Sequence, residues 1–287
     1  MRLCQTAFSV VLALALAACG SGRREYTLQG QVLSFAPDRR QADIKHEEIK
    51  GFMSAMTMAY KVRDAKEFEG LAPGDLITAT LVVVSNDAYL KDVKKVGSAP
   101  LERPAAPAPS ASSGFELLRD GEPVPNVAFV TEDGKHIDFE GLKGRAVLVT
   151  FIYTRCPLPT FCPLMDRQFA TIQAKLKERG NDLNAQLLSV SFDPVTDTPP
   201  VLEKHAQSLG ADPRLWTFVT GDLDELDRWA SRFGVSVSRA LNDPRDITHN
   251  LRTAIVDRQG NLVRNYTGNE WTPEQLLADL KVMVGVD

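Results

Sequence analysis

Apolar and polar positions divide the chain into two parts with different periodicity. Between residues 26 and 96 the apolar positions come in short runs, among them YTLQGQVLSF, ADIKHEEI, MTMAYKV, DLITATLVVV and AYLKDVKKV. Runs of this length with alternating character are typical of strands that bury one face. Turn residues separate them at Pro37-Asp38 and at residues 72–75. The pattern predicts a small all-β barrel.

After residue 115 the pattern changes to strands that alternate with helices. The predicted strands read AVLVTFIY, AQLLSVSF, WTFVTG and TAIVD, and amphipathic segments of 11 to 19 residues lie between and after them. Such alternation predicts an α/β domain over residues 115–287. Thr198-Pro199 and Thr272-Pro273 are predicted helix starts, because threonine caps and proline fits the first turn.

Residues 97–114 differ in composition from both parts. They are rich in Pro, Ala and Ser (GSAPLERPAAPAPSASSG) and offer little apolar surface to bury. A segment of this kind is extended and semi-rigid, and at about 3.1 Å per residue it would reach on the order of 50 Å. We therefore expect a linker that lets two domains meet or separate.

The first 18 residues predict an export signal. Arg2 precedes an apolar stretch over residues 7–18 that is short for a membrane span and ends in small residues. The junction LAAC resembles a bacterial lipobox, which implies cleavage before Cys19 and lipidation of its sulfur; the alternative is an ordinary cleaved signal peptide. The expected location is the periplasmic side of a bacterial envelope, with the lipid as the only membrane anchor. The net charge of −4 without basic clusters disfavours nucleic acid.

Two cysteines, Cys156 and Cys162, follow the predicted buried strand AVLVTFIY and, apart from the lipidated Cys19, are the only ones left once the leader is removed. Functional groups gather on loops that a rigid scaffold holds. A helix that begins near Pro163 would favour the thiolate of an adjacent cysteine. Redox chemistry, a soft metal ion and a structural disulfide are the open interpretations.

Three methionines, Met53, Met56 and Met58, lie within six positions shortly after His46. In a strand, Met56 and Met58 point to the same face. Thioethers are neutral and soft, and suit Cu(I) or Ag(I) better than zinc or magnesium. The alternative is that they fill an irregular barrel core.

Residues 115–284 resemble the Sco/SenC family of copper chaperones in the segments TRCPLPTFCPLM, SVSFDPVTDTPPVL, DITHN and TAIVDRQGNLV. The resemblance implies a thioredoxin-like fold and one copper ion held by Cys156, Cys162 and His249; the alternative for His249 is an exposed loop residue without a role. Asp193 matches an acidic position of the family, near the site or capping a loop. The other histidines of this part, His136 and His205, are expected to be ordinary surface residues.

The cysteine loop departs from the family pattern, because five residues separate the cysteines where three are usual. It also differs from thioredoxin-like reductases, which have two residues there and a proline ahead of the hairpin strand, where this chain reads Thr248-His249-Asn250-Leu251.

Residues 26–96, through HEEIKGFMSAMTMAY, resemble the small periplasmic copper-binding domains of the CusF type. The resemblance implies an OB-like barrel with a second copper site at His46, Met56 and Met58. A tryptophan covers the metal in that family; Met53 lies near the corresponding position and is a candidate fourth ligand.

Together these resemblances imply a copper chaperone that delivers copper to the dinuclear centre of a cytochrome c oxidase, or to another copper carrier. A thiol-disulfide reductase using Cys156 and Cys162 and a copper-buffering lipoprotein are the alternatives. An enzymatic activity other than thiol exchange is not expected.

Overall fold

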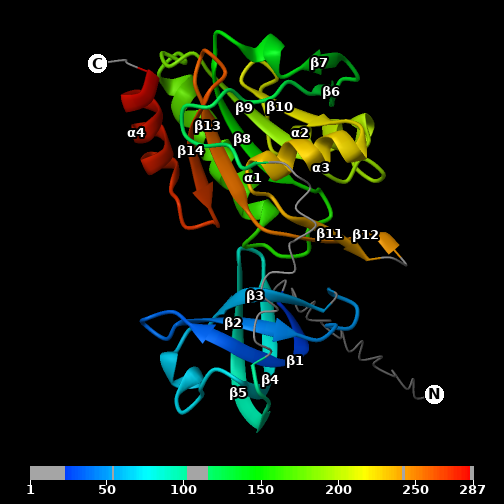
Figure 1. Cartoon of the computed structure of the whole chain (residues 1–287), viewed down its shortest axis with the longest axis vertical. Helices are drawn as coiled ribbons and strands as arrows, with labels where there is room; N and C mark the ends of the chain where they lie inside the picture. The colour runs from blue at the N-terminus through cyan, green and yellow to red at the C-terminus, as the bar shows by residue number, and fades with distance from the viewer. Residues whose placement is uncertain (1–22, 54, 102–115, 241–242, 285–287) are drawn as a thin grey trace, which may run out of the picture.

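The computed structural model describes residues 23–53, 55–101, 116–240 and 243–284, which form two sheet-based units (Figure 1). The predicted leader with Cys19 and most of the predicted linker lie outside these residues. Within them, no helix is long and apolar enough to cross a membrane.

The N-terminal unit is an antiparallel sheet in the order β3-β2-β1-β4-β5. Its elements are β1 (Arg24–Phe35), β2 (Gln41–His46), β3 (Met56–Lys61), the 3₁₀ turn η1 (Ala65–Phe68), β4 (Asp75–Val84) and β5 (Asp87–Ser98). Inward-facing apolar side chains alternate with exposed ones, and the core includes the fully buried Leu28, Ile44, Phe68 and Leu81. The predicted all-β unit is confirmed.

The edges of this sheet, β3 and β5, lie near each other but are not joined by a ladder. Among the described residues, one isolated bridge joins Val62, the residue after β3, to Leu90 of β5. A closed OB-like barrel therefore stays a prediction. At the other end, β5 extends two residues into the segment predicted as linker, because Gly97 and Ser98 pair with β4 and the Ser98 hydroxyl donates to Asp75 at 2.7 Å.

The C-terminal unit is a seven-stranded sheet in the order β14-β13-β8-β9-β10-β6-β7. Parallel pairing joins β8, β9 and β10, and antiparallel pairing joins the outer strands. The elements of this unit are β6 (Ala128–Thr131), β7 (His136–Asp138), η2 (Glu140–Leu142), β8 (Ala146–Ile152), α1 (Cys162–Glu178), β9 (Ala185–Ser191), α2 (Pro199–Ser208), β10 (Trp216–Thr220), α3 (Leu223–Arg232), β11 (Val237–Ala240), β12 (Asp243–His249), β13 (Arg252–Val256), β14 (Leu262–Thr267) and α4 (Pro273–Val284). The predicted α/β architecture and late hairpin are confirmed.

Helices cover both faces of this sheet. On one face the Thr253 hydroxyl of β13 reaches the Met165 sulfur of α1 at 3.8 Å. On the other face Phe151 of β8 packs against Trp229 of α3, with ring centroids 5.8 Å apart. The central strands β8 and β9 are buried along their whole length, as parallel strands between two helical layers must be.

The predicted helix starts are present, with one difference in capping. The Thr272 hydroxyl accepts from the Gln275 backbone N–H at 3.2 Å at the start of α4. Thr198 holds the N-cap position of α2 but makes no such bond, so the proline at the first turn is the remaining start signal there.

The sequence pattern did not predict two short hairpins. One joins β6 and β7 at the sheet edge, and the other joins β11 and β12. The second hairpin matters for function because β12 ends at His249.

Candidate metal centre

The cysteine loop connects β8 to α1. Cys162 is the first residue of α1 and is 1% exposed, whereas Cys156 lies on the loop and is partly buried. Both are free thiols in the structure, so the loop is not closed by a structural disulfide.

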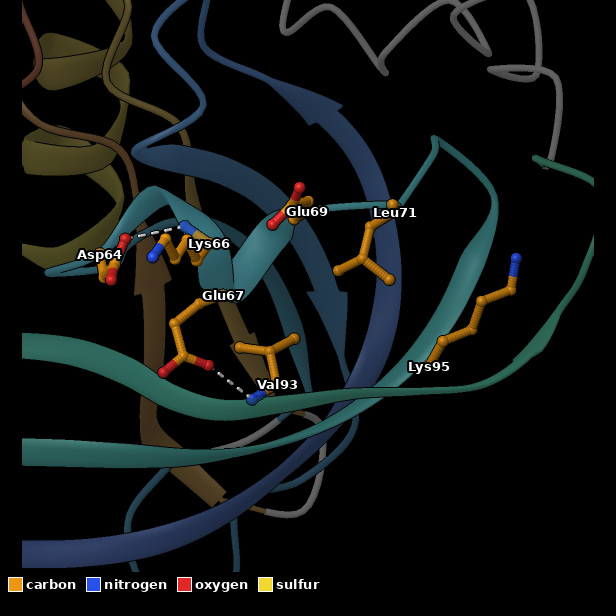
Figure 2. Close-up of a pocket in the computed structure, with 8 residues that line it drawn as sticks. Asp64, Lys66, Glu67, Glu69, Leu71, Val93 and Lys95 are labelled. Carbon is orange, nitrogen blue, oxygen red and sulfur yellow. Dashed lines mark hydrogen bonds between the residues drawn. The ribbon is translucent and has the colours of Figure 1, made fainter.

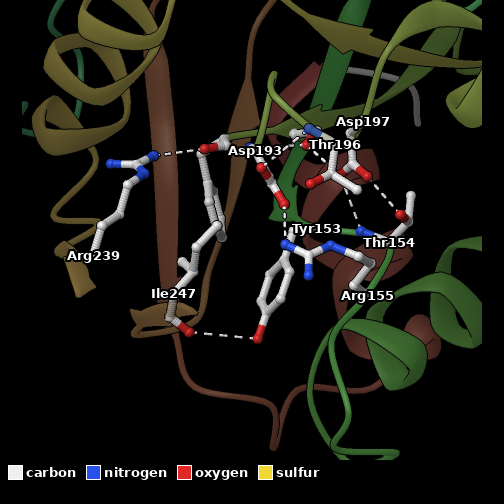
Figure 3. A network of polar contacts seen from close by, with 10 residues as sticks. Tyr153, Thr154, Arg155, Asp193, Thr196, Asp197, Arg239 and Ile247 are labelled. Carbon is white, nitrogen blue, oxygen red and sulfur yellow. Dashed lines mark hydrogen bonds and ion pairs between the residues drawn. The ribbon is translucent and has the colours of Figure 1, made fainter. Parts of the chain in front are cut away.

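Two buried carboxylates hold the start of this loop (Figure 3). Asp197 accepts from the backbone N–H and the hydroxyl of Thr154 at 3.0 and 2.5 Å, and also from the Ser191 hydroxyl. Asp193 forms an ion pair with Arg155 at 2.8 Å. Asp193 also accepts from the Thr196 N–H at 3.3 Å, so it both supports the cysteine loop and caps its own turn. The segment SVSFDPVTD carries both carboxylates; the role of Asp197 was missed in the sequence analysis.

His249 is brought to the loop from β12. Its ring packs on Phe192 and Tyr153, with ring centroids 4.5 and 5.6 Å away. Its Nδ1 lies 2.8 Å from the Asn250 carbonyl oxygen. Because a carbonyl can only accept, Nδ1 carries the proton and Nε2 presents a lone pair in the neutral ring. Burial lowers the pKa of His249 to about 4, which keeps the ring neutral near pH 7.

That lone pair faces the buried thiol, since His249 Nε2 lies 3.6 Å from Cys162 Sγ. Zinc, for comparison, binds nitrogen at about 2.0 Å and sulfur at about 2.3 Å. With a trigonal angle between those two bonds, the nitrogen and sulfur atoms would lie about 3.7 Å apart. The pair therefore fits a bound ion without a large shift.

Cys156 is linked to this pair through Cys162, which shares a thiol hydrogen bond with it. Throughout the described residues, no three His, Cys, Asp or Glu side chains are arranged around a common centre as a ready-made cluster. Cys156 must therefore turn toward His249 for all three predicted ligands to meet one ion.

The two thiols differ in acidity in a direction that the sequence did not predict. The hydrogen bond from Cys162 lowers the pKa of Cys156. Burial raises the pKa of Cys162 far above its ordinary value. The expectation that the helix start favours the thiolate at Cys162 is therefore wrong, because loss of solvent outweighs the helix dipole.

His205 is not an ordinary surface residue as expected. Its ring packs on Phe218, and its Nε2 lies 3.0 Å from Asp166, a buried carboxylate one turn after Cys162. Burial alone would lower the pKa of His205, but the Asp166 carboxylate raises it on balance. This pair supports α1 behind the thiols. His136 is exposed, in agreement with expectation.

Met56 and Met58 lie on β3, an edge strand of the N-terminal sheet. Met56 pairs directly with His46 across β3 and β2, and Met58 pairs with Ile44. On the other side His46 pairs with Gly30. A Cβ at Gly30 would lie 2.9 Å from the His46 Cα and 2.7 Å from the Lys45 carbonyl oxygen, so only glycine permits this close approach.

His46 repeats the ring arrangement of His249. Its Nδ1 lies 2.6 Å from the Glu47 carbonyl oxygen and therefore carries the proton. Its Nε2 is buried without any hydrogen-bond partner. An orphaned buried acceptor of this kind fits a metal ligand. Burial lowers the pKa of His46, which favours the neutral ring that a metal requires.

Tyr60 contacts both Met53 and His46 and so places Met53 close to this site. The Tyr60 hydroxyl donates to the Met53 sulfur at 3.8 Å, and the Tyr60 ring packs on His46 with centroids 5.6 Å apart. Met53, Met56 and Met58 are all partly exposed, so none of them is a fully buried core residue.

A separate hollow of about 420 Å³ lies beside η1 and β5 (Figure 2). Two of its three carboxylates already accept hydrogen bonds from the backbone, since Asp64 accepts from the Lys66 N–H and Glu67 from the Val93 N–H, each at 3.0 Å. No His, Cys or Met lines it, so it does not suit a soft metal.

Comparison with known proteins identifies both units. The family model described as SCO1/SenC matches residues 123–285, and the model of the copper binding periplasmic protein CusF matches residues 25–95. The chain is 30% identical over 155 residues to the SCO1 protein homolog of Bacillus subtilis, which covers 53% of this chain and 78% of that protein.

Two solved structures share the C-terminal fold. A SCO1/SenC family lipoprotein from Bacillus anthracis is 27% identical with a TM-score of 0.51, covering 58% of this chain and 98% of that one. BsSco, described as a member of the Sco family of cytochrome c oxidase assembly proteins, is 28% identical with a TM-score of 0.50, covering 60% and 100%. The predicted thioredoxin-like fold of the C-terminal unit is thereby confirmed.

The acidity difference between the thiols predicts the order in which they react. In the metal-free, reduced chain, iodoacetamide should modify Cys156 before Cys162 near pH 7, because the thiolate is the reactive form and Cys156 has the lower pKa and the more accessible sulfur. Peptide mass spectrometry over time measures both rates. Cys162→Ala should shift the alkylation of Cys156 to higher pH, because the donor that stabilises its thiolate is gone. Faster modification of Cys162 in the wild-type chain would contradict the assignment.

Proposed function

Because the chain belongs to the SCO1/SenC family, we propose that it is a copper chaperone that binds copper through Cys156, Cys162 and His249. The observation that carries this proposal is the 3.6 Å approach of the unprotonated His249 Nε2 to the Cys162 sulfur. Two thiolates select Cu(I) by their softness, and an imidazole also tolerates Cu(II). Copper is the cargo of this site.

The recipient that we propose is the dinuclear copper centre of a cytochrome c oxidase. The related BsSco is described as belonging to a family of cytochrome c oxidase assembly proteins, which supports this choice. Another copper carrier would need the same soft ligands and is the second candidate partner.

A thiol-disulfide reductase is the alternative that one observation favours. The lowered pKa of Cys156 and its contact with Cys162 resemble an attacking thiol with its resolving partner. Thiol exchange needs no imidazole lone pair, whereas copper binding by this set does. His249 therefore discriminates between the two functions.

Two substitutions test the thiol site. Cys156→Ser combined with Cys162→Ser should weaken Cu(I) binding by the C-terminal unit by more than about a hundredfold, because changes to residues that merely support metal ligands already cost about 10- to 100-fold. His249→Ala should keep both thiols and any reductase activity but fail to load copper into an apo oxidase fragment. Anaerobic Cu(I) titration and loading assays measure both effects.

The matched control is His136→Ala, which changes an exposed histidine on β7 and should leave copper binding and loading unchanged. Full loading of the oxidase fragment by the His249→Ala chain would instead favour the reductase.

For the N-terminal unit we propose a second site for Cu(I), which also accepts Ag(I), formed by His46, Met56 and Met58, with Met53 as a fourth ligand. The match to the CusF model and the orphaned His46 Nε2 support it. The site would hold one ion more weakly than the thiols do, because its sulfur ligands are neutral.

This site can be tested in the full chain once the thiols are removed. A chain with Cys156→Ser and Cys162→Ser should still bind one Ag(I), and further replacement of Met56 and Met58 by Leu should abolish that binding. Isothermal titration measures the stoichiometry, and circular dichroism checks the fold. Unchanged Ag(I) binding after both Leu replacements would show that the methionines only fill space.

We also propose that the protein faces the periplasm and is anchored by lipid at Cys19. The related Bacillus anthracis protein is described as a lipoprotein and the matched CusF model as periplasmic, which supports this location. Mass spectrometry of the membrane-extracted protein should find acyl chains on an N-terminal Cys19, and Cys19→Ala should release the protein from the membrane. An unmodified N-terminus at another residue would contradict the anchor.

A further inference from the structure

The two proposed copper sites face each other across one cavity. It measures about 180 Å³ and is lined from the N-terminal unit by Phe52, Met53 and Met56. From the C-terminal unit it is lined by Cys156 and His249, together with Tyr153, Arg155, Pro157, Leu158, Phe161 and Ile247. Figure 1 shows the N-terminal unit beneath the C-terminal one, with β3 at the end that faces the cysteine loop.

Met56 holds a special place in this arrangement. It pairs with His46 inside the methionine site and also lines the cavity that contains Cys156 and His249. A methionine side chain has three rotatable bonds, so its sulfur can turn from one site to the other. The cavity is many times larger than the roughly 15 Å³ that one water needs, which leaves room for an ion and for that rotation.

We propose that copper is bound between the two units, with the Met56 thioether completing the coordination of the ion at Cys156, Cys162 and His249. This inference rests on the proposed function. It adds a ligand from the other unit to the thiol site, and it gives the ion a short route from the methionine site to the thiols along the shared cavity.

The transfer is a ligand exchange without a redox step. Copper stays Cu(I) throughout; its bonds to His46, Met53 and Met58 break as bonds to the two cysteine sulfurs and to His249 Nε2 form. Each cysteine thiol releases its proton to water, and the bond to Met56 persists during the exchange. The direction is set by charge and softness, since anionic thiolates hold Cu(I) more tightly than neutral thioethers.

Docking of the two units raises the local concentration of the acceptor ligands. Because both units belong to one chain, the exchange is intramolecular and does not depend on protein concentration. Copper that enters at the exposed edge strand β3 would therefore reach the thiols before a competing ligand in solution captured it.

Phe52 supplies a control for Met56. Both belong to the N-terminal unit, are partly buried and line the cavity that contains Cys156. Phe52 carries no atom that binds copper, so Phe52→Leu changes the lining of the cavity without removing a ligand. Met56→Leu keeps a similar apolar volume.

The test uses the full chain loaded anaerobically with one equivalent of Cu(I), which occupies the tighter thiol site. The Cu(I) chelator bathocuproine disulfonate then removes the ion, and stopped-flow absorbance gives the rate. Met56→Leu should speed removal by about tenfold, the lower end of what even supporting residues contribute to metal affinity. Phe52→Leu should leave the rate within about twofold of wild type, because it removes no copper ligand.

X-ray absorption on the same samples provides a second readout. The wild-type and Phe52→Leu chains should show one longer copper–sulfur distance besides the thiolates, and the Met56→Leu chain should lack it. Equal removal rates in the two variants, or a long sulfur distance that survives Met56→Leu, would overturn the composite site. Neither result would affect the proposed function, which fails if the double cysteine variant still binds tightly or if the His249→Ala chain loads the oxidase fragment fully.

Discussion

A hydrogen bond between the ring of His249 and the Asn250 carbonyl decides what the candidate site can do. A carbonyl accepts and never donates, so the bond fixes the proton on Nδ1 and turns an unprotonated Nε2 toward Cys162. In the opposite tautomer the ring would present an N–H to the thiol and no lone pair to an ion. The same device recurs at His46, whose Nδ1 bonds the Glu47 carbonyl on an unrelated sheet. In both cases the acceptor belongs to the next residue, so the tautomer is set by local backbone geometry.

The strands and helices around these sites could be predicted because their signals are local. The alternation of apolar and polar residues along MTMAYKV indicates a strand that is buried on one face. The uninterrupted apolar run AVLVTFIY indicates a strand that is buried on both faces. The candidate ligands could be proposed because Cys156, Cys162 and His249 lie in segments that resemble a known family. The short β11–β12 hairpin escaped prediction, although it delivers His249. Strands of this length lack enough positions for a periodic signal.

Properties that depend on packing could not be predicted from the sequence. The start of α1 argued for an acidic thiol at Cys162, but the structure buries that sulfur and makes Cys156 the more acidic one. His205 looked like a surface residue until α2 placed it against Asp166. The composition of residues 97–114 predicted how far a linker could extend. It did not predict which surfaces of the two units would be in contact. The cavity shared by Met56 and His249 follows from that docking alone.

The carboxylates of Asp193 and Asp197 hold the cysteine loop at its start, and α1 holds it at its end. Cys162 is thus held by α1 and His249 by β12, so neither position depends on the segment between the two cysteines. Only Cys156 depends on how many residues that segment contains. A change in the length of this loop between related chains would therefore alter the position and reactivity of Cys156 alone. The geometry of the Cys162–His249 pair would stay the same. In this chain five residues, including Pro157 and Pro159, separate the two cysteines and set the position of Cys156.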